Sequence, residues 1–90
     1  METYEMQPRV DATNAKAVQA ELEELVANGI NELTLDFAGN KYISSAGLRA
    51  VLATQKKLTK SGGSLTLVNV PDAVKEIFDV TGYSRFLNIQ

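Results

Sequence analysis

The spacing of apolar residues switches back and forth along the chain between two periods, which sharply limits the folds open to it. Tyr4, Met6 and Val10 alternate with polar residues, so the first residues are predicted to form a short strand extending to about Pro8. Beyond this strand the apolar residues recur at helical spacing, and Asn28-Gly29 is a typical helix stop. A chain that alternates in this way favours an α/β fold.

The first predicted helix begins shortly after the first strand. Asp11 and Thr13 are candidate N-cap residues, because their side-chain oxygens accept hydrogen bonds from the first helical turn. The apolar face of this helix is formed by Val18, Leu22, Leu25 and Val26.

The same alternation continues to the C-terminus. The further predicted elements are a strand at 33–37, a helix from Ser44-Ser45 to about 60, a buried strand at 65–70, a helix from Pro71-Asp72 to Gly82, and a short strand formed by Phe86, Leu87 and Ile89. The resulting order predicts a four-stranded, mostly parallel sheet with right-handed crossovers and about three helices. A length of 90 residues is expected to form a single domain, 1–90.

Composition excludes several classes of function. The chain has no cysteine and no histidine, which removes disulfides, thiolate nucleophiles, the commonest zinc ligands and the commonest general base. A net charge of −2 argues against nucleic-acid binding. We therefore expect no enzyme activity, no metal and no cofactor. The absence of a long apolar run or a signal-like N-terminus favours a cytoplasmic protein without a membrane span.

The segment Tyr42–Leu48 is the most informative part of the chain. It is predicted to join the end of a strand to the start of a helix. In open α/β sheets, functional residues cluster at the carboxyl ends of the strands. One of the two hydroxyls of Ser44-Ser45 is expected to cap the helix and the other to point outward. A phosphate at this place would meet free N–H groups and the positive end of the helix dipole, worth about 0.3–1 kcal/mol when exposed. Two capping serines remain the simpler alternative.

The run Ile43-Ser44-Ser45-Ala46-Gly47-Leu48-Arg49 between a strand and an amphipathic helix strongly resembles the signature loop of STAS domains, the family of bacterial anti-sigma factor antagonists. The resemblance continues in Arg9-Val10-Asp11-Ala12, in Ser61-Gly62-Gly63, in Val74–Phe78 and in Thr81-Gly82, and covers residues 9–87 in order.

This resemblance implies a mechanism. The dephosphorylated protein would bind an anti-sigma factor that is also a serine kinase and so release the sigma factor. Phosphorylation would end the binding, and a serine phosphatase would reset the protein. By motif position the phosphoacceptor is Ser45, although family members often have Asp where Ser44 stands. The implied partner-binding residues are Asp11, Asn14, Ser44, Ala46, Gly47 and Leu48.

Two further expectations follow from departures from the family pattern. Only eight residues precede Arg9, whereas family members usually have two strands there, so the domain is expected to be N-terminally shortened. The sheet edge left uncovered could pair with a second copy and give a weak homodimer. The alternative function is a STAS module that is never phosphorylated, and that binds a nucleotide or anion or serves a transport or lipid-trafficking assembly.

Overall fold

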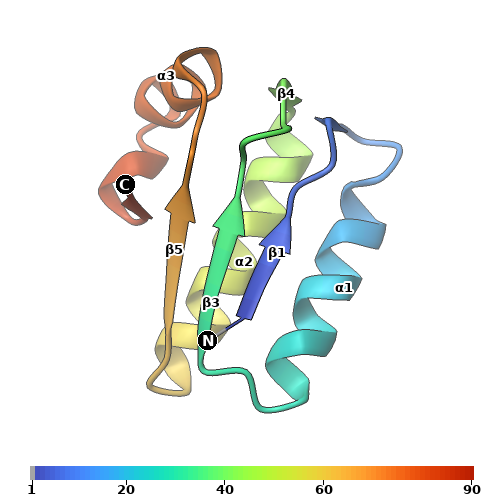
Figure 1. The fold of residues 1–90 in the computed structure, drawn as a ribbon, viewed down its shortest axis with the longest axis vertical. Helices are drawn as coiled ribbons and strands as arrows, with labels where there is room; N and C mark the ends of the chain where they lie inside the picture. Colours follow the sequence, from blue (N-terminus) through green and yellow to red (C-terminus); the bar gives the residue numbers. More distant parts are fainter. Residues whose placement is uncertain (1) are drawn as a thin grey trace.

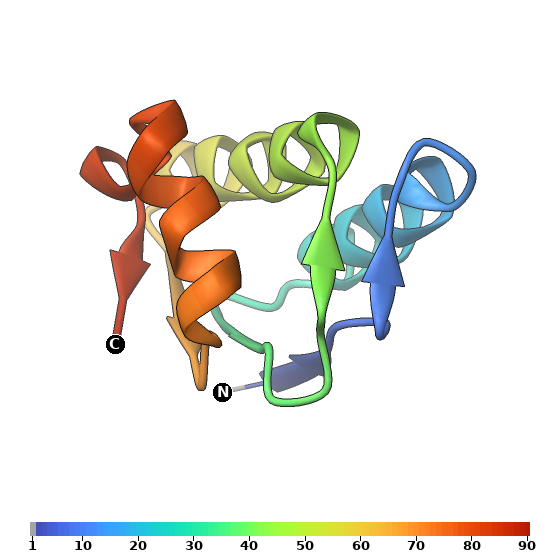
Figure 2. The same ribbon diagram turned by 90° about the horizontal axis from the view of Figure 1, so that it is seen from above.

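The computed structural model describes residues 2–90, which form a two-layer α/β fold (Figure 1). The elements in chain order are β1 (Glu2–Glu5), β2 (Arg9–Val10), α1 (Ala15–Ala27), β3 (Glu32–Asp36), β4 (Tyr42–Ile43), α2 (Ser45–Lys60), β5 (Ser64–Val68), α3 (Asp72–Thr81), the 3-10 helix η1 (Tyr83–Arg85) and β6 (Asn88–Ile89). Figures 1 and 2 show α1 and α2 side by side over one face of the main sheet.

The main sheet has four strands in the order β1-β3-β5-β6, and every neighbouring pair is parallel. This confirms the predicted four-stranded parallel sheet with three helices. In the central pair, Leu33 lies opposite Leu65 and Leu35 opposite Leu67. These four leucines are buried and share one core cluster with residues of both α1 and α2. β1 occupies one edge of the sheet, and within residues 2–90 it pairs with β3 alone.

The sheet is covered on one face only. Along β5 the buried residues Leu65 and Leu67 alternate with the half-buried Thr66 and Val68. The structure therefore corrects the predicted buried strand at 65–70, which is fully buried on one face only and is shorter than predicted. The strand ends at Val68, and Asn69 takes a left-handed backbone conformation with φ of 55° that turns the chain toward α3.

A second, two-stranded sheet was not predicted. It pairs β2 with β4 in parallel, so the residues expected to form one strand to about Pro8 form two, β1 and β2. Pro8 lies between them and has no N–H to continue a ladder, while its carbonyl accepts from the Lys41 amide at 2.8 Å. Figure 2 shows β2 and β4 running from the sheet layer toward the starts of α1 and α2.

The C-terminal elements largely follow the prediction. Gly82 ends α3 with a left-handed φ of 82°, a conformation that favours glycine. The last strand comprises Asn88–Ile89, so Phe86 lies outside it and is 63% exposed. Within residues 2–90 no helix is long and apolar enough to cross a membrane.

α3 contributes two buried residues to the core, Val74 and the larger Phe78. The Phe78 ring packs edge-on against Phe37 at the end of β3, with ring centroids 5.9 Å apart and an interplanar angle of 84°. Both rings are fully buried. Such pairs add to the stabilisation that comes from apolar burial alone.

Replacement of this buried ring should be costly. We expect Phe78→Ala to lower the free energy of unfolding by about 3–5 kcal/mol, because it removes apolar contacts and leaves a cavity. The matched control is Val80→Ala on the same helix, since Val80 is 80% exposed and should change stability by less than about 0.5 kcal/mol. Urea denaturation of both variants checks this, and equal losses would contradict the packing of α3 described here.

Candidate functional site

The parallel pair β2–β4 places the starts of two helices next to each other. Arg9 lies opposite Tyr42 and Val10 opposite Ile43, and the Ser44 amide continues the pairing by donating to the Val10 carbonyl at 2.8 Å. Each short strand leads into a helix, β2 into α1 and β4 into α2 (Figure 2). The structure therefore brings Asp11, which follows Val10, beside the loop that contains Ser44 and Ser45.

The two serines have different structural roles. Ser44 is the N-cap of α2, with extended backbone angles of φ −86° and ψ 173°, and its Oγ accepts from the Gly47 amide at 3.3 Å. Its carbonyl accepts the first helical hydrogen bond, from the Leu48 amide at 2.9 Å. This is the arrangement expected of a capping serine.

Ser45 is the first residue of α2 and is exposed to solvent. No hydrogen bond joins its hydroxyl to any other residue within 2–90. At this position the first-turn amides lack intrahelical acceptors, and the helix dipole is positive. The prediction that one serine caps and the other points outward agrees with this geometry, with Ser44 as the cap.

Gly47 allows α2 to lie directly against the β2–β4 pair. A Cβ atom placed on Gly47 would lie 2.6 Å from Ile43 Cγ1 and 2.8 Å from Val10 Cγ1. Distances this short require the neighbouring side chains to move. Glycine is needed here because of close packing, since its φ lies outside the left-handed region.

The neighbours of Gly47 differ in accessibility. Leu48 is only 2% exposed and belongs to the core, so its side chain supports the loop from within. Ala46 is half-buried and lines a groove between α1 and α2. Among the implied partner-binding residues of this loop, Ala46 and Ser44 are thus partly accessible, whereas Gly47 and Leu48 are buried.

Asp11 organises the turn that leads into α1. Its carboxylate accepts hydrogen bonds from the Thr13 hydroxyl, from the Thr13 amide at 2.9 Å and from Arg9 Nε at 2.8 Å. The Arg9 guanidinium also stacks over the Tyr42 ring, 4.4 Å from its centroid. These bonds, the Thr13 hydroxyl foremost, hold the pKa of Asp11 at about 2, below its usual value.

The N-cap of α1 is Asn14, so the prediction that Asp11 or Thr13 caps this helix was wrong. The Asn14 side chain does not cap the helix. Its Oδ1 accepts from the Asp11 amide at 2.9 Å, and its Nδ2 donates to the Arg9 carbonyl at 2.8 Å. Asn14, an implied partner-binding residue, therefore stabilises the β2–α1 turn through both the oxygen and the nitrogen of its side-chain amide.

The role of Asn40 was not predicted from the sequence. It is 1% exposed, and its Nδ2 donates to the carbonyls of Gln7 at 2.7 Å and Tyr42 at 3.1 Å. It thereby fixes the chain before β2 to the chain at β4. The only signal was an asparagine after a glycine, which is typical of an exposed turn.

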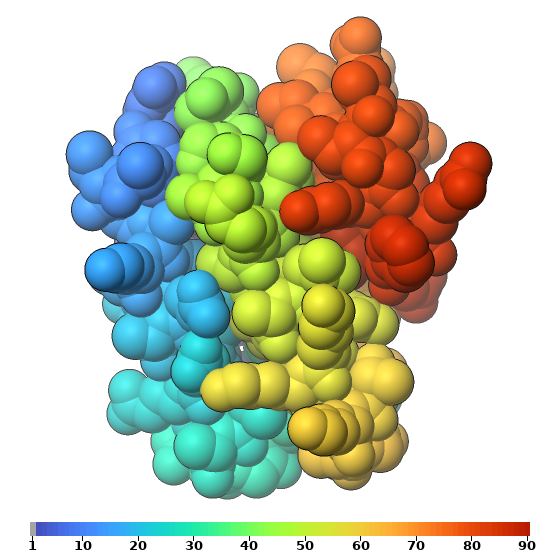
Figure 3. Space-filling model, turned by 180° about the vertical axis from the view of Figure 1, so that it is seen from behind, coloured from blue at the N-terminus to red at the C-terminus, as the bar shows by residue number. Residues whose placement is uncertain are grey.

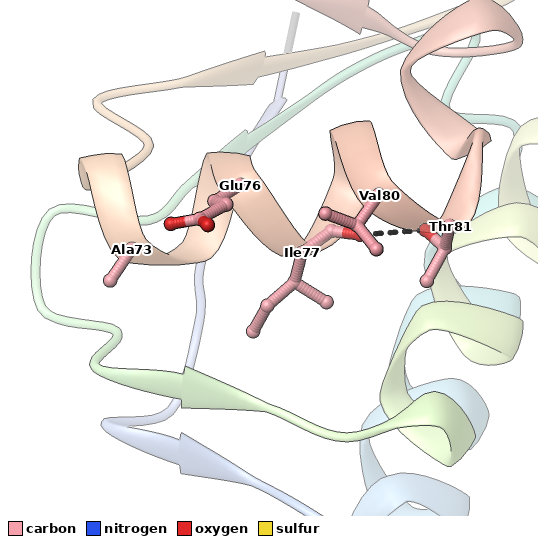
Figure 4. Close-up of a pocket in the computed structure, with 5 residues that line it drawn as sticks. All are labelled: Ala73, Glu76, Ile77, Val80 and Thr81. Atoms are coloured by element: carbon pink, nitrogen blue, oxygen red, sulfur yellow. Dashed lines mark hydrogen bonds between the residues drawn. The ribbon is translucent and has the colours of Figure 1, made fainter.

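Two other kinds of site, a metal site and a second hollow, can be assessed from the described residues. Within residues 2–90 no group of three or more acidic, histidine or cysteine side chains could hold a metal ion. A second hollow lies along α3 and is lined by Ala73, Glu76, Ile77, Val80 and Thr81 (Figure 4). The Thr81 hydroxyl there donates to the Ile77 carbonyl at 2.7 Å, so this hollow offers mainly apolar surface and one carboxylate.

The fold and the loop geometry define the class of the protein. The family model of the STAS domain matches residues 3–90, and the chain belongs to this family. It is 38% identical over 78 residues to BtrV of Bordetella bronchiseptica, whose name places it among anti-sigma factor antagonists; the match covers 87% of this chain and 67% of BtrV. It is 30% identical over 80 residues to the anti-sigma-B factor antagonist of Bacillus subtilis, covering 89% and 72% of the two chains.

Solved structures agree on the fold. The anti-sigma factor antagonist SpoIIAA in its unphosphorylated form superposes with a TM-score of 0.84 over 98% of this chain and 77% of that chain, at 16% identity. The phosphorylated form of Bacillus SpoIIAA gives a TM-score of 0.75 over 98% and 80% of the two chains, also at 16% identity.

The family is one of non-enzymatic regulators, which confirms the expectation that the chain is not an enzyme.

The close packing of Gly47 can be tested by adding one methyl group. We expect Gly47→Ala to lower the free energy of unfolding by about 1–2 kcal/mol, because overpacking outweighs the gain in helix propensity. Gly39→Ala is the matched control, since nothing lies within 4 Å of the added Cβ. Thermal unfolding of both variants checks the difference, and a stabilised Gly47→Ala protein would refute the packing argument.

The Asp11 carboxyl should titrate at a pH of about 2 in the folded protein. A depressed pKa means that its interactions stabilise the fold above the ordinary aspartate range, and that this contribution is lost as the pH falls toward 2. Thr13→Val removes the largest cause and should raise the Asp11 pKa toward its usual value. Carbon-detected NMR titration measures it, with Thr3→Val as the control, and an unchanged pKa in Thr13→Val would contradict this network.

Proposed function

We propose that this chain is an anti-sigma factor antagonist whose binding is switched off by phosphorylation of Ser45. The observation that carries the proposal is that the two neighbouring serines have different structural roles. Ser44 caps α2, whereas Ser45 is exposed and its hydroxyl has no hydrogen-bond partner within the described chain. Similarity to relatives that are named antagonists supports the class of partner.

In the unphosphorylated state the partner would be an anti-sigma factor that is also a serine kinase. The surface offered to it has few bulky side chains around Ser45, with Ala46 beside it and Gly47 buried beneath. Asp11 is held in place at the edge of this surface by Arg9 and Thr13. Binding here would compete with the sigma factor for the anti-sigma factor and so release the sigma factor.

Phosphorylation would transfer the γ-phosphoryl group of ATP to Ser45. The Ser45 oxygen forms a bond to the γ-phosphorus, the bond to the bridging oxygen of ADP breaks, and the hydroxyl proton passes to a base on the kinase. A serine phosphatase would reverse the change by directing water to the phosphorus, which releases phosphate and restores the hydroxyl. The chain is the substrate in both reactions.

The physical effect of the phosphate differs between the fold and the interface. At the N-terminus of α2 an added dianion meets the positive end of the helix dipole, so the fold should change in stability by no more than about 2 kcal/mol. A partner surface that fits a neutral hydroxyl would instead have to desolvate this dianion, which is far more costly. The domain therefore stays folded while the partner dissociates.

The alternative function, a STAS module that binds a nucleotide or anion and is never phosphorylated, gains less support. The hollow along α3 has no basic side chain among its lining residues, and the two cations of the groove between α1 and α2 lie next to the loop that holds Ser45, where a phosphate on that serine can use them. Weak self-association through the free edge of β1 stays a prediction, as does a single domain over 1–90.

The switch can be tested by substitution at the two serines. We expect Ser45→Asp to abolish binding to an anti-sigma kinase from the same genome, and Ser45→Ala to bind and never be phosphorylated. Ser44→Ala is the matched control: it should lose about 1 kcal/mol of stability with the cap, yet still accept phosphate. Calorimetry measures binding, and intact mass after incubation with ATP measures transfer.

Two outcomes would overturn the proposal. Phosphate mapped to Ser44 by tandem mass spectrometry would refute the assignment of the acceptor. Binding of Ser45→Asp as tight as that of the unmodified protein would refute the electrostatic mechanism.

A further inference from the structure

A groove lies between α1 and α2 next to the candidate phosphoacceptor. Its volume is about 230 Å³, and its lining residues come from the turn before α1 and from the N-terminal parts of the two helices: Ala12, Ala15, Lys16, Gln19, Ala46 and Arg49. The space-filling view in Figure 3 shows the two helices side by side on this face of the molecule. Small alanines form much of the groove, and two cations, Lys16 and Arg49, stand on its opposite walls.

Neither cation has a carboxylate partner in the part of the chain that is described. The ion pairs within residues 2–90 join Arg9 to Asp11 and Lys57 to Glu23. Lys16 and Arg49 are both exposed, and no hydrogen bond ties either side chain to residues 2–90. Of the polar residues in the groove, Gln19 is engaged, because its amide donates to Glu23 at 2.9 Å. The groove thus presents two free positive charges in a chain whose net charge is −2.

Ser45 is next to this groove in the chain. It immediately precedes Ala46, which lines the groove, and it lies four residues before Arg49 on the same helix. Residues four apart on a helix face the same way, with Cβ atoms about 5–6 Å apart. The long arginine side chain and a phosphate on Ser45 can therefore meet, and Lys16 approaches the same space from α1.

We propose that Arg49 and Lys16 bind the phosphate on Ser45 within the same chain, so that the modified side chain lies across the groove between α1 and α2. This inference rests on Ser45 being the phosphoacceptor. It adds a second effect to the proposed switch. The phosphate adds negative charge, and it also occupies the groove and its two cations, so that a partner can no longer contact them.

The surrounding charges favour this contact. Within the β2 turn and the N-terminal parts of α1 and α2 that border the groove, the charged side chains are Arg9, Asp11, Lys16 and Arg49. The single acid among them is neutralised by Arg9, with which it forms an ion pair of 2.8 Å. Lys16 and Arg49 remain free, and arginine offers a planar pair of N–H donors that matches phosphate oxygens.

The test uses the whole chain with phosphoserine incorporated at position 45 during synthesis, so that no kinase is needed. Phosphorus NMR then gives the second pKa of the phosphate, which is about 6 for a free phosphoserine. We expect Arg49→Gln and Lys16→Gln each to raise this pKa, lowering the proton dissociation constant about twofold to fivefold, as befits exposed ion pairs. Both residues are exposed, so the variants should fold.

Lys56→Gln is the matched control. Lys56 is an exposed lysine on the same helix, eleven residues beyond Ser45 and so about 16 Å away along the axis, which exceeds the Debye length of about 8 Å at physiological salt. Its removal should leave the phosphate pKa unchanged. The Arg49 Nε–H resonance should also shift when Ser45 carries phosphate.

Equal phosphate pKa values in the unsubstituted protein and in the Arg49→Gln and Lys16→Gln variants would overturn the proposal. An effect of Arg49→Gln alone, with Lys16→Gln equal to the control, would overturn the bridging of the groove. Because the phosphate is installed synthetically, either result stands whether or not a kinase modifies Ser45 in the cell. Failure of the proposed function would appear instead as an unmodified Ser45 after incubation with ATP and kinase.

Discussion

The contact of Gly47 with Val10 and Ile43 is the constraint on which the candidate site depends. Val10 and Ile43 are opposite residues of the β2–β4 pair, and both are fully or almost fully buried. Because Gly47 has no side chain, the first turn of α2 lies directly on them. This fixes the height and direction of α2, so that Ser44 reaches the Val10 carbonyl through its amide while Ser45 stays at the surface. A bulkier residue would move both serines together.

The sequence was sufficient to predict the elements with a long periodic pattern of apolar residues. It was also sufficient to predict that one of the two serines caps a helix while the other is free. The amphipathic runs defined α1, α2 and α3, and two adjacent hydroxyls before a helix already indicated one cap and one free group. What the sequence could not show was the β2–β4 sheet. Two-residue strands carry no period, and their pairing depends on Asn40, which donates to Gln7, 33 residues earlier in the chain. The burial of the strand at 65–70 was overestimated because a run of apolar residues does not reveal that helices cover one face only.

The residues that hold the fold are separate from the groups that the proposed switch would use. The residues that hold the loop are buried or bonded internally: Gly47 and Leu48 in the core, Asn14 across the β2 turn, and Ser44 on the helix. The groups that would respond to a phosphate, Ser45, Lys16 and Arg49, are exposed and contribute little to the fold. A charge can therefore be added at the start of α2 without disturbing the packing beneath it, because the interior does not depend on the state of the surface hydroxyl.

The position of Ser45 on the first turn of a helix has a consequence for molecular recognition. Many modified serines lie in flexible segments, which must be ordered on an enzyme surface at a cost of about 1–2 kcal/mol per residue in backbone entropy. Here the backbone of Ser45 is already held in helical geometry by the folding of the domain. An enzyme that acts on this serine has to fit a rigid surface contributed by segments distant in the sequence, residues 9–16 and 42–49. Its specificity would then reside in the tertiary structure of its substrate, and a linear peptide cut from this loop would not carry it.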